Sequence, residues 1–80
     1  MYILKVDLGN DIGVRTIVAG IRDQYKKEEL EGKLIVCVVN LEPKPVAGVE
    51  SQGMLLAAQS DDVVAILTPA KEVKPGSIVR

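Results

Sequence analysis

Short apolar runs, separated by polar, glycine-rich or proline-rich stretches, extend through the whole chain. In residues 2–8, the apolar side chains Tyr, Leu, Val and Leu occupy every second position, a pattern typical of a half-buried strand. Residues 9–13 are dense in turn-forming residues, and β-branched side chains resume in residues 14–18. The pattern therefore predicts a β-hairpin at the start of the chain.

Residues 22–31 consist mainly of charged residues that favour helices, and few apolar side chains there could face a core. Asp23 is a suitable N-terminal cap, and Gly32 is a suitable residue to end the helix. We expect one short helix of about two turns between these two residues.

Residues 33–39 are apolar on both faces, as in a central strand covered by the helix or by a partner chain. Further short strands are expected at residues 54–58, 63–67 and 78–79. Residues 40–45, with two prolines, are expected to form a turn or an edge, and turns are expected at residues 60–62 and 75–76. Such short, closely spaced strands predict a mostly β fold, a small barrel or sandwich. No linker divides the sequence, so we expect a single domain formed by residues 1–80.

Composition narrows the possible functions. The 80 residues carry 10 Lys and Arg against 11 Asp and Glu, and the net charge of −1 gives no overall basic field to attract nucleic acid. Histidine is absent, which removes the usual general base and the commonest metal ligand. Cys37 is the single cysteine, and its apolar neighbours favour a small buried hydrophobe over a nucleophile. We therefore expect no catalytic residue, no metal, no cofactor and no enzymatic activity.

The apolar runs are much shorter than the roughly 20 residues that a membrane-spanning helix needs. Residues 1–7 lack the basic start and the small-residue cleavage site of a secretory signal peptide. The sequence thus predicts a cytoplasmic protein without membrane association.

Residues 39–58 combine a proline turn, a glycine-hinged loop and a return into a strand. The segment carries neutral hydrogen-bonding groups, a cation and an adaptable apolar side chain, namely Asn40, Ser51, Gln52, Lys44 and Met54. Such groups could hold a base or a sugar. The alternative is an ordinary loop in which Met54 fills the mouth of a barrel.

This segment resembles the signature of the tRNA-binding domain appended to methionyl-tRNA synthetases, through the run Asn40-Leu41-x-Pro43-Lys44-x-x-x-Gly48-Val49-Glu50-Ser51-Gln52-Gly53-Met54-x-Leu56-Ala57-Ala58. The flanking segments at residues 5–9, 15–21, 28–33, 67–69 and 73–77 are also similar to that family. The same domain occurs in free-standing homodimeric tRNA-binding proteins. The resemblance covers essentially the whole chain.

The resemblance implies an oligonucleotide-binding barrel, the OB-fold, that binds tRNA by shape with little reading of bases. It implies tRNA as a partner and a role as an accessory domain or subunit of methionyl-tRNA synthetase. The implied contact residues are Asn40, Lys44, Ser51, Gln52 and Met54, with Lys5, Arg15 and Arg22 as further candidates for phosphate contacts.

The family domain begins with one more strand, so this chain resembles it from the second strand onward. The resemblance therefore implies a partial or open barrel. An open edge, together with the apolar run at residues 33–39, predicts a homodimer. Two other functions stay open: an export-chaperone-like protein of the same fold that binds peptides in an apolar cleft, and a dimerisation module without affinity for RNA.

Overall fold

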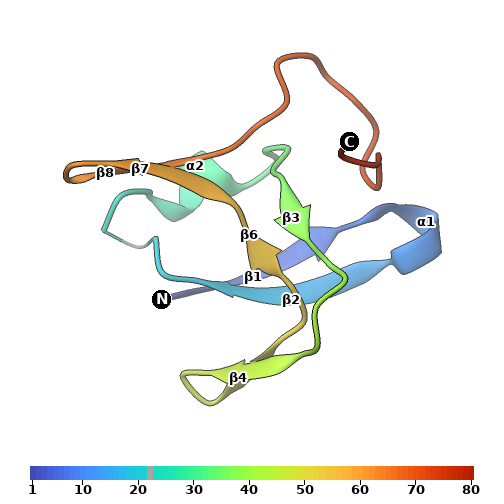
Figure 1. Ribbon diagram of the computed structural model, residues 1–80, viewed down its shortest axis with the longest axis horizontal. Coiled ribbons are helices and arrows are strands. Elements are labelled where there is room, and N and C mark those ends of the chain that lie inside the picture. The colour runs from blue at the N-terminus through green and yellow to red at the C-terminus, as the bar shows by residue number, and fades with distance from the viewer. Residues whose placement is uncertain (22) are drawn as a thin grey trace.

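Antiparallel strand pairs dominate the computed structural model, which describes residues 1–21 and 23–80. The pairs are β1 (Tyr2–Asp7) with β2 (Val14–Ala19), β3 (Cys37–Val38) with β6 (Met54–Leu55), β4 (Lys44–Val46) with β5 (Val49–Ser51), and β7 (Ala57–Ser60) with β8 (Val63–Ile66). Two short helices, α1 (Gly9–Ile12) and α2 (Lys27–Leu30), lie in the described residues. The chain is thus mostly β with open sheets, as expected for a partial, open barrel (Figure 1).

The N-terminal hairpin is confirmed, with Tyr2 opposite Ala19 in the β1–β2 pair. Its connection contains α1, a helical turn that the sequence did not predict. Gly9 begins this turn and Gly13 follows it, with φ angles of +86° and +82°, a region of backbone conformation that favours glycine.

The core is small and aliphatic. Val6, Ile17, Ala19 and Ile21 are buried, and Ile17 is completely inaccessible at 0% exposure. Ser51 is the buried polar residue among those described. Because most of these side chains belong to the N-terminal hairpin, this hairpin is the element on which the other strand pairs pack.

The predicted helix is present but shorter than expected. α2 is a single turn that begins after Lys26, whose backbone N–H donates to Glu29 Oε1 at 2.8 Å, so Asp23 is not its cap. The physical reason lies in the two preceding residues. The backbone N–H groups of Gln24 and Tyr25 both donate to Ile21 O at 3.0 Å, which makes a turn, and their side chains bind at the edge of β8.

The predicted central strand at residues 33–39 is wrong in extent, because only Cys37–Val38 pairs as a strand, with Met54–Leu55. The apolar pattern correctly indicated partial burial, since residues 34–39 are half-buried. Val36 instead links two other segments through its backbone. Its N–H donates to Leu67 O at 3.2 Å, and its carbonyl oxygen accepts from Leu56 N at 2.9 Å.

Two of the strands predicted for the C-terminal half differ in the structure. The expected strand at residues 54–58 is divided at Leu56 into β6 and β7, because its two halves pair with different partners. No strand forms at residues 78–79, where Ile78 and Val79 are 77% and 69% exposed. The predicted turn at Pro75 and Gly76 is present.

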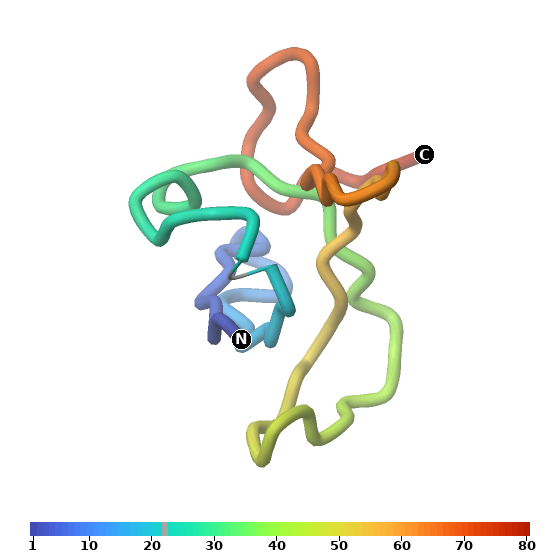
Figure 2. The backbone as a smooth tube through the Cα atoms, turned by 90° about the vertical axis from the view of Figure 1, so that its left-hand side faces the viewer, coloured from blue at the N-terminus to red at the C-terminus, as the bar shows by residue number. Residues whose placement is uncertain are grey.

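The hairpin of β1 and β2 lies between two outer parts of the molecule. Both the ribbon and the backbone tube place the β4–β5 hairpin at one end and the C-terminal segment, residues 67–80, at the other (Figures 1 and 2). Surfaces carried by these two parts are therefore well separated.

Candidate nucleic-acid interface

Ser51 joins the end of β5 to the N-terminal hairpin. Its Oγ accepts a hydrogen bond from Val18 N at 3.1 Å and donates one to Gly53 O at 3.0 Å. The residue is only 6% exposed. Both functions of the hydroxyl, donor and acceptor, are thus used inside the protein.

Gln52 continues this connection through both its backbone and its side chain. Its N–H donates to Thr16 O at 2.8 Å, and its Oε1 accepts from Thr16 N at 3.0 Å. Together these bonds satisfy the outward backbone groups of Thr16, much as a neighbouring strand would. The remaining Nε2 group of this half-buried side chain has no hydrogen-bond partner within residues 1–21 and 23–80.

Arg15 holds two neighbouring segments together. Its Nη1 donates to Val39 O at 2.8 Å and to Gln52 O at 3.3 Å, and the side chain is half-buried. Lys5, opposite Thr16 in the hairpin, donates from Nζ to Thr16 Oγ1 at 2.7 Å but is exposed. Of these two cations, Lys5 is therefore the one with open access to solvent.

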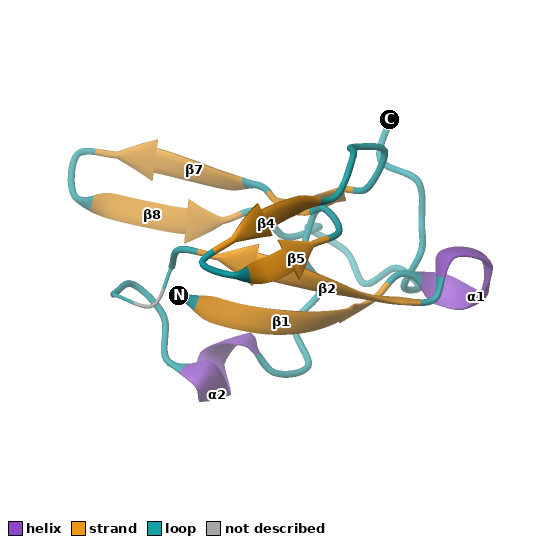
Figure 3. Ribbon diagram, turned by 90° about the horizontal axis from the view of Figure 1, so that it is seen from below, coloured by secondary structure: helices purple, strands orange, loops and turns teal. Residues whose placement is uncertain are grey.

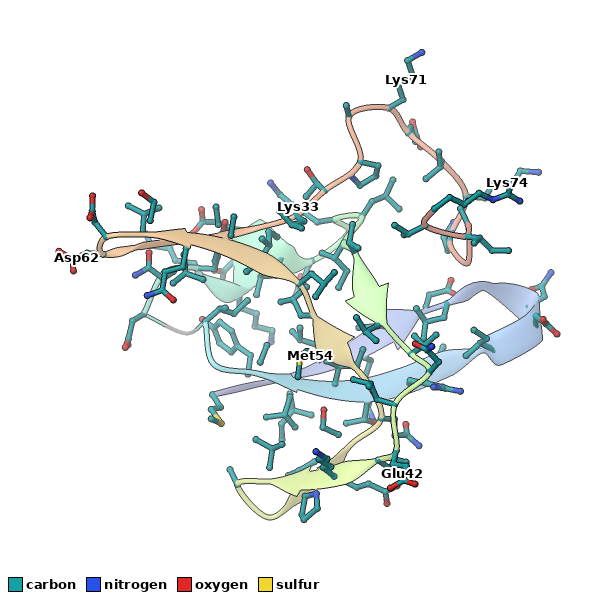
Figure 4. The ribbon with its side chains drawn as sticks, in the orientation of Figure 1. Lys33, Glu42, Met54, Asp62, Lys71 and Lys74 are labelled. Carbon is teal, nitrogen blue, oxygen red and sulfur yellow. The ribbon has the colours of Figure 1, made fainter. Side chains whose placement is uncertain are left out.

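Gly53 allows the segment to approach the core closely. A Cβ at this position would lie 2.8 Å from Val38 O and 3.3 Å from Ile17 Cδ1, so a larger residue would push the segment away. The next residue, Met54, faces solvent with 54% exposure (Figure 4). Met54 does not fill the core, so the alternative of a methionine plug does not hold.

Asn40, Lys44 and Met54 are exposed, and we call these three residues the rim. Strand pairing places them on connected segments: Met54 lies opposite Val38, two residues before Asn40, and Lys44 lies opposite Ser51, three residues before Met54.

The charges around the rim are mixed. Glu50 lies opposite Pro45, next to Lys44, and Glu42 lies two residues before Lys44. Electrostatic attraction to an anion is therefore local to the Lys44 ammonium group.

Among the predicted contact residues, hydrogen bonds thus hold Lys5, Arg15, Ser51 and Gln52 against the N-terminal hairpin and its neighbouring segments, whereas Asn40, Lys44 and Met54 are exposed. Arg22 lies outside the described residues. Sequence reasoning missed Thr16, which bonds to both Lys5 and Gln52. Nothing in the local sequence marks Thr16, because its partner Gln52 lies 36 residues further along the chain.

An apolar groove lies beside β1 of the N-terminal hairpin. It has a volume of about 1300 Å³ and lies between β1, residues 33–40 and the C-terminal segment. Cys37 is among its lining residues, and burial raises the pKa of its thiol above the ordinary value of 9.0. The neutral thiol is favoured there, as expected for a small hydrophobe.

Within residues 1–21 and 23–80, no three carboxylate or thiol side chains gather closely enough to hold a metal ion. Neither α1 nor α2 has the length or apolar character to cross a membrane.

Residues 1–78 match the family model described as "Putative tRNA binding domain", and the chain belongs to this tRNA-binding domain family. Over all 80 residues it is 59% identical to part of the methionine–tRNA ligase of Pyrococcus horikoshii. The chain spans only 11% of the length of that protein.

Solved structures with the same fold include two kinds of protein. A MetRS related protein from Pyrococcus horikoshii is 51% identical with a TM-score of 0.86, and the match covers 98% of this chain and 71% of that one. The CsaA chaperone protein from Picrophilus torridus is 39% identical with a TM-score of 0.90, and the match covers 99% and 72% of the two chains.

Proposed function

We propose that this chain binds tRNA through the rim, with Lys5 as an additional phosphate contact. The observation that carries this proposal is that the residues of the family motif fall into two groups, one bonded inside the protein and one exposed to solvent. Ser51, Gln52 and Arg15 are used in internal hydrogen bonds, whereas the rim residues are exposed. Ser51 and Arg15 therefore act as positioning residues, and Gln52 has its Nε2 group to offer to RNA.

The charge of the protein limits how it can bind. With a net charge of −1, the attraction to RNA comes from a few local cations. If about three or four phosphates are contacted, the slope of log affinity against log salt is about −3. Such a modest slope follows from the small number of phosphate contacts.

Lys44 and Met54 separate the electrostatic from the apolar contribution. Lys44→Ala should reduce the salt slope by about one and weaken all tRNAs alike. Met54→Ala should lower affinity without a change in slope, because its contribution is apolar contact. Lys71→Ala is the matched control, since Lys71 is exposed and lies at the opposite end of the molecule from Glu42, which is two residues before Lys44 (Figure 4).

The decisive experiment is a gel-shift titration at low salt with folded tRNA and an unstructured RNA of the same length. Tighter binding of the folded tRNA is expected. Equal binding of the two RNAs overturns the tRNA-binding role. A loss of slope in Lys71→Ala equal to that in Lys44→Ala overturns the assignment of the rim.

We further propose that the domain acts as a homodimer and assists methionyl-tRNA synthetase. The 59% identity to part of a methionine–tRNA ligase supports the second point, and the open sheets support the first. Light scattering at high micromolar concentration tests the assembly. A mass near 8.6 kDa, that of one chain, overturns the homodimer.

A second candidate function is peptide binding, and the apolar groove is the observation that favours it. The groove is lined by Lys5 and Asn40 of the proposed tRNA contacts but not by Lys44 or Met54, and the fold is shared with CsaA chaperone proteins. Binding of an extended apolar peptide, measured by fluorescence anisotropy, should be insensitive to salt. No binding, or binding that weakens strongly with salt, overturns this candidate.

A further inference from the structure

Thr16 is bonded by two side chains that reach it from opposite sides. From β1, the Lys5 ammonium group donates to Thr16 Oγ1 at 2.7 Å. From the segment that follows β5, Gln52 Oε1 accepts from Thr16 N at 3.0 Å. Both can reach this residue because β2 runs between β1 and β5 (Figure 3). The Lys5 ammonium and the Gln52 amide therefore meet at Thr16.

The position of Thr16 in the β1–β2 ladder explains its short contact with Lys5. The two residues lie opposite each other. The backbone N–H and C=O of Thr16 are both bonded to Gln52, on the side away from β1. Thr16 and Lys5 thus form a non-hydrogen-bonded pair, the type in which the Cα atoms are about 4.5 Å apart and the side chains approach most closely. The lysine side chain therefore reaches across the sheet to the hydroxyl.

Three hydrogen-bond donors remain at this point of the sheet. The Lys5 ammonium has three N–H groups and uses one of them on Thr16. The Thr16 hydroxyl accepts that bond and keeps its own O–H, for which the described residues offer no acceptor. Gln52 binds Thr16 through Oε1, and its Nε2 is likewise without a partner in residues 1–21 and 23–80. An ammonium, a hydroxyl and an amide can thus all donate to one ligand.

The charge at this point is positive. Asp7 lies on the same face of β1 as Lys5, but its Oδ1 accepts from Gly9 N at 3.0 Å. Among the described residues, the ion pair is that of Lys27 with Glu31, so no carboxylate there lies within 4.0 Å of Lys5 Nζ. Donor groups with one positive charge fit an anion that has several acceptor oxygens, and phosphate is such an anion.

We propose that Thr16 is a positioning residue that joins Lys5 and Gln52 into one contact site for a backbone phosphate of RNA. The proposal rests on the tRNA-binding function proposed above and gives these residues a shared ligand. The hydroxyl holds the ammonium in place before binding, so less side-chain entropy is lost when the phosphate binds. A single exposed charge holds a free phosphate ion weakly, so the ligand that fits is one phosphate of a longer chain.

A double-mutant cycle on RNA affinity tests the role of Thr16. Thr16→Val removes the hydroxyl but keeps a β-branched side chain and the backbone groups that bond to Gln52. It should weaken RNA binding about two- to tenfold, the effect of losing the preorganisation of one flexible side chain. In a Lys5→Ala background the same change should have little effect, because no ammonium is left to position.

Two further variants complete the cycle. Thr16→Ser keeps the hydroxyl and should bind RNA as the wild type does. Thr68→Val makes the same chemical change as Thr16→Val at an exposed threonine of the C-terminal segment, and it is the matched control. Circular dichroism verifies that every variant is folded.

Gln52→Glu tests the contribution of Gln52. The variant keeps an oxygen that can accept from Thr16 N, and it replaces the Nε2 donor with a charged oxygen. Because the carboxylate repels a phosphate, affinity should fall further than in Thr16→Val. Gln59→Glu is the control, since it changes the net charge equally on the exposed strand β7.

The outcomes separate this site from the tRNA-binding function. A phosphate contact does not depend on RNA shape, so the coupling of Thr16 with Lys5 should appear with folded tRNA and with unstructured RNA alike. Equal losses from Thr16→Val in the wild-type and Lys5→Ala backgrounds, or unchanged affinity of Gln52→Glu, overturn the site and leave tRNA binding in place. Coupling without any preference for folded tRNA overturns the tRNA-binding role and leaves the site.

Two other outcomes are decisive. Inorganic phosphate at constant ionic strength should not displace RNA. Displacement at low millimolar phosphate that disappears in Lys5→Ala assigns these residues to free phosphate and overturns the contact with RNA. Absence of binding to either RNA overturns both the site and the tRNA-binding role.

Discussion

Gly9 and Gly76 lie against each other, backbone to backbone. A Cβ on Gly76 would come within 2.9 Å of Gly9 Cα, and a Cβ on Gly9 within 3.1 Å of Gly76 Cα. One glycine begins α1 and the other lies in the last turn of the chain. The contact fixes the C-terminal segment to the corner of the N-terminal hairpin.

Gly76→Ala should therefore destabilise the protein. Gly76 has a φ of +88°, and its new Cβ would lie 2.6 Å from Leu8 O. The left-handed conformation alone costs an alanine about 1–2 kcal/mol, and the clash adds to this. Gly32→Ala is the control, because Gly32 has a φ of +76° and a Cβ added there would meet nothing within 4 Å. Urea denaturation should show a larger loss for Gly76→Ala, and equal losses would contradict the contact.

Ser51→Ala should lower the free energy of unfolding by about 1–3 kcal/mol, because Val18 N–H loses its partner in a buried position. Ser60→Ala is the comparison, since Ser60 is exposed, and a change of less than about 0.5 kcal/mol is expected there. Chemical denaturation of both variants provides the measurement. If the two serines behaved alike, the Ser51 hydroxyl would have no positioning role.

Ile17→Ala should lower the free energy of unfolding by about 2–5 kcal/mol, because it leaves a cavity in a small core. Ile17 is completely buried, whereas Val14 on the same strand is 64% exposed. Val14→Ala should cost about 1 kcal/mol or less, the range of strand propensity. Thermal melting followed by circular dichroism compares the two, and similar melting temperatures would be inconsistent with a core centred on β2.

Cys37 should react slowly with iodoacetamide in the folded protein, since only the thiolate is nucleophilic and burial raises the thiol pKa above 9.0. The pH profile of the reaction should lie at higher pH than that of the urea-unfolded chain. The raised pKa also makes the free energy of unfolding depend on pH. The stabilising contribution of the neutral Cys37 thiol is complete below the pKa of the unfolded chain and is lost as the pH rises through the pKa of the folded protein. Identical pH profiles in the two states would exclude the shift.

The sequence predicted elements that depend on local pattern. The β1–β2 hairpin follows from alternation and β-branched residues, and these properties are visible within a single window. The extent of β3 was not predictable in the same way, because apolarity indicates burial but does not identify a pairing partner. Val36 bonds to Leu56 and Leu67, both far along the chain.

The site was predictable only as a list of residues. Ser51 and Gln52 are polar residues beside a glycine, a context that is usual for an exposed loop. Their internal roles depend on Val18 and Thr16, which lie 33 and 36 residues away. Division of the motif into positioning residues and an exposed rim therefore required the tertiary structure.

The separation of the strands into independent pairs implies that the molecule opens in stages. Amide hydrogen exchange should divide the backbone into units of different protection, because few ladder bonds connect one pair to the next. Amides of β7 and β8 should exchange early, since β7 is wholly exposed, and those of β2 around Ile17 should exchange last. The N-terminal hairpin would then persist after its neighbours have detached, as the last folded part of the chain.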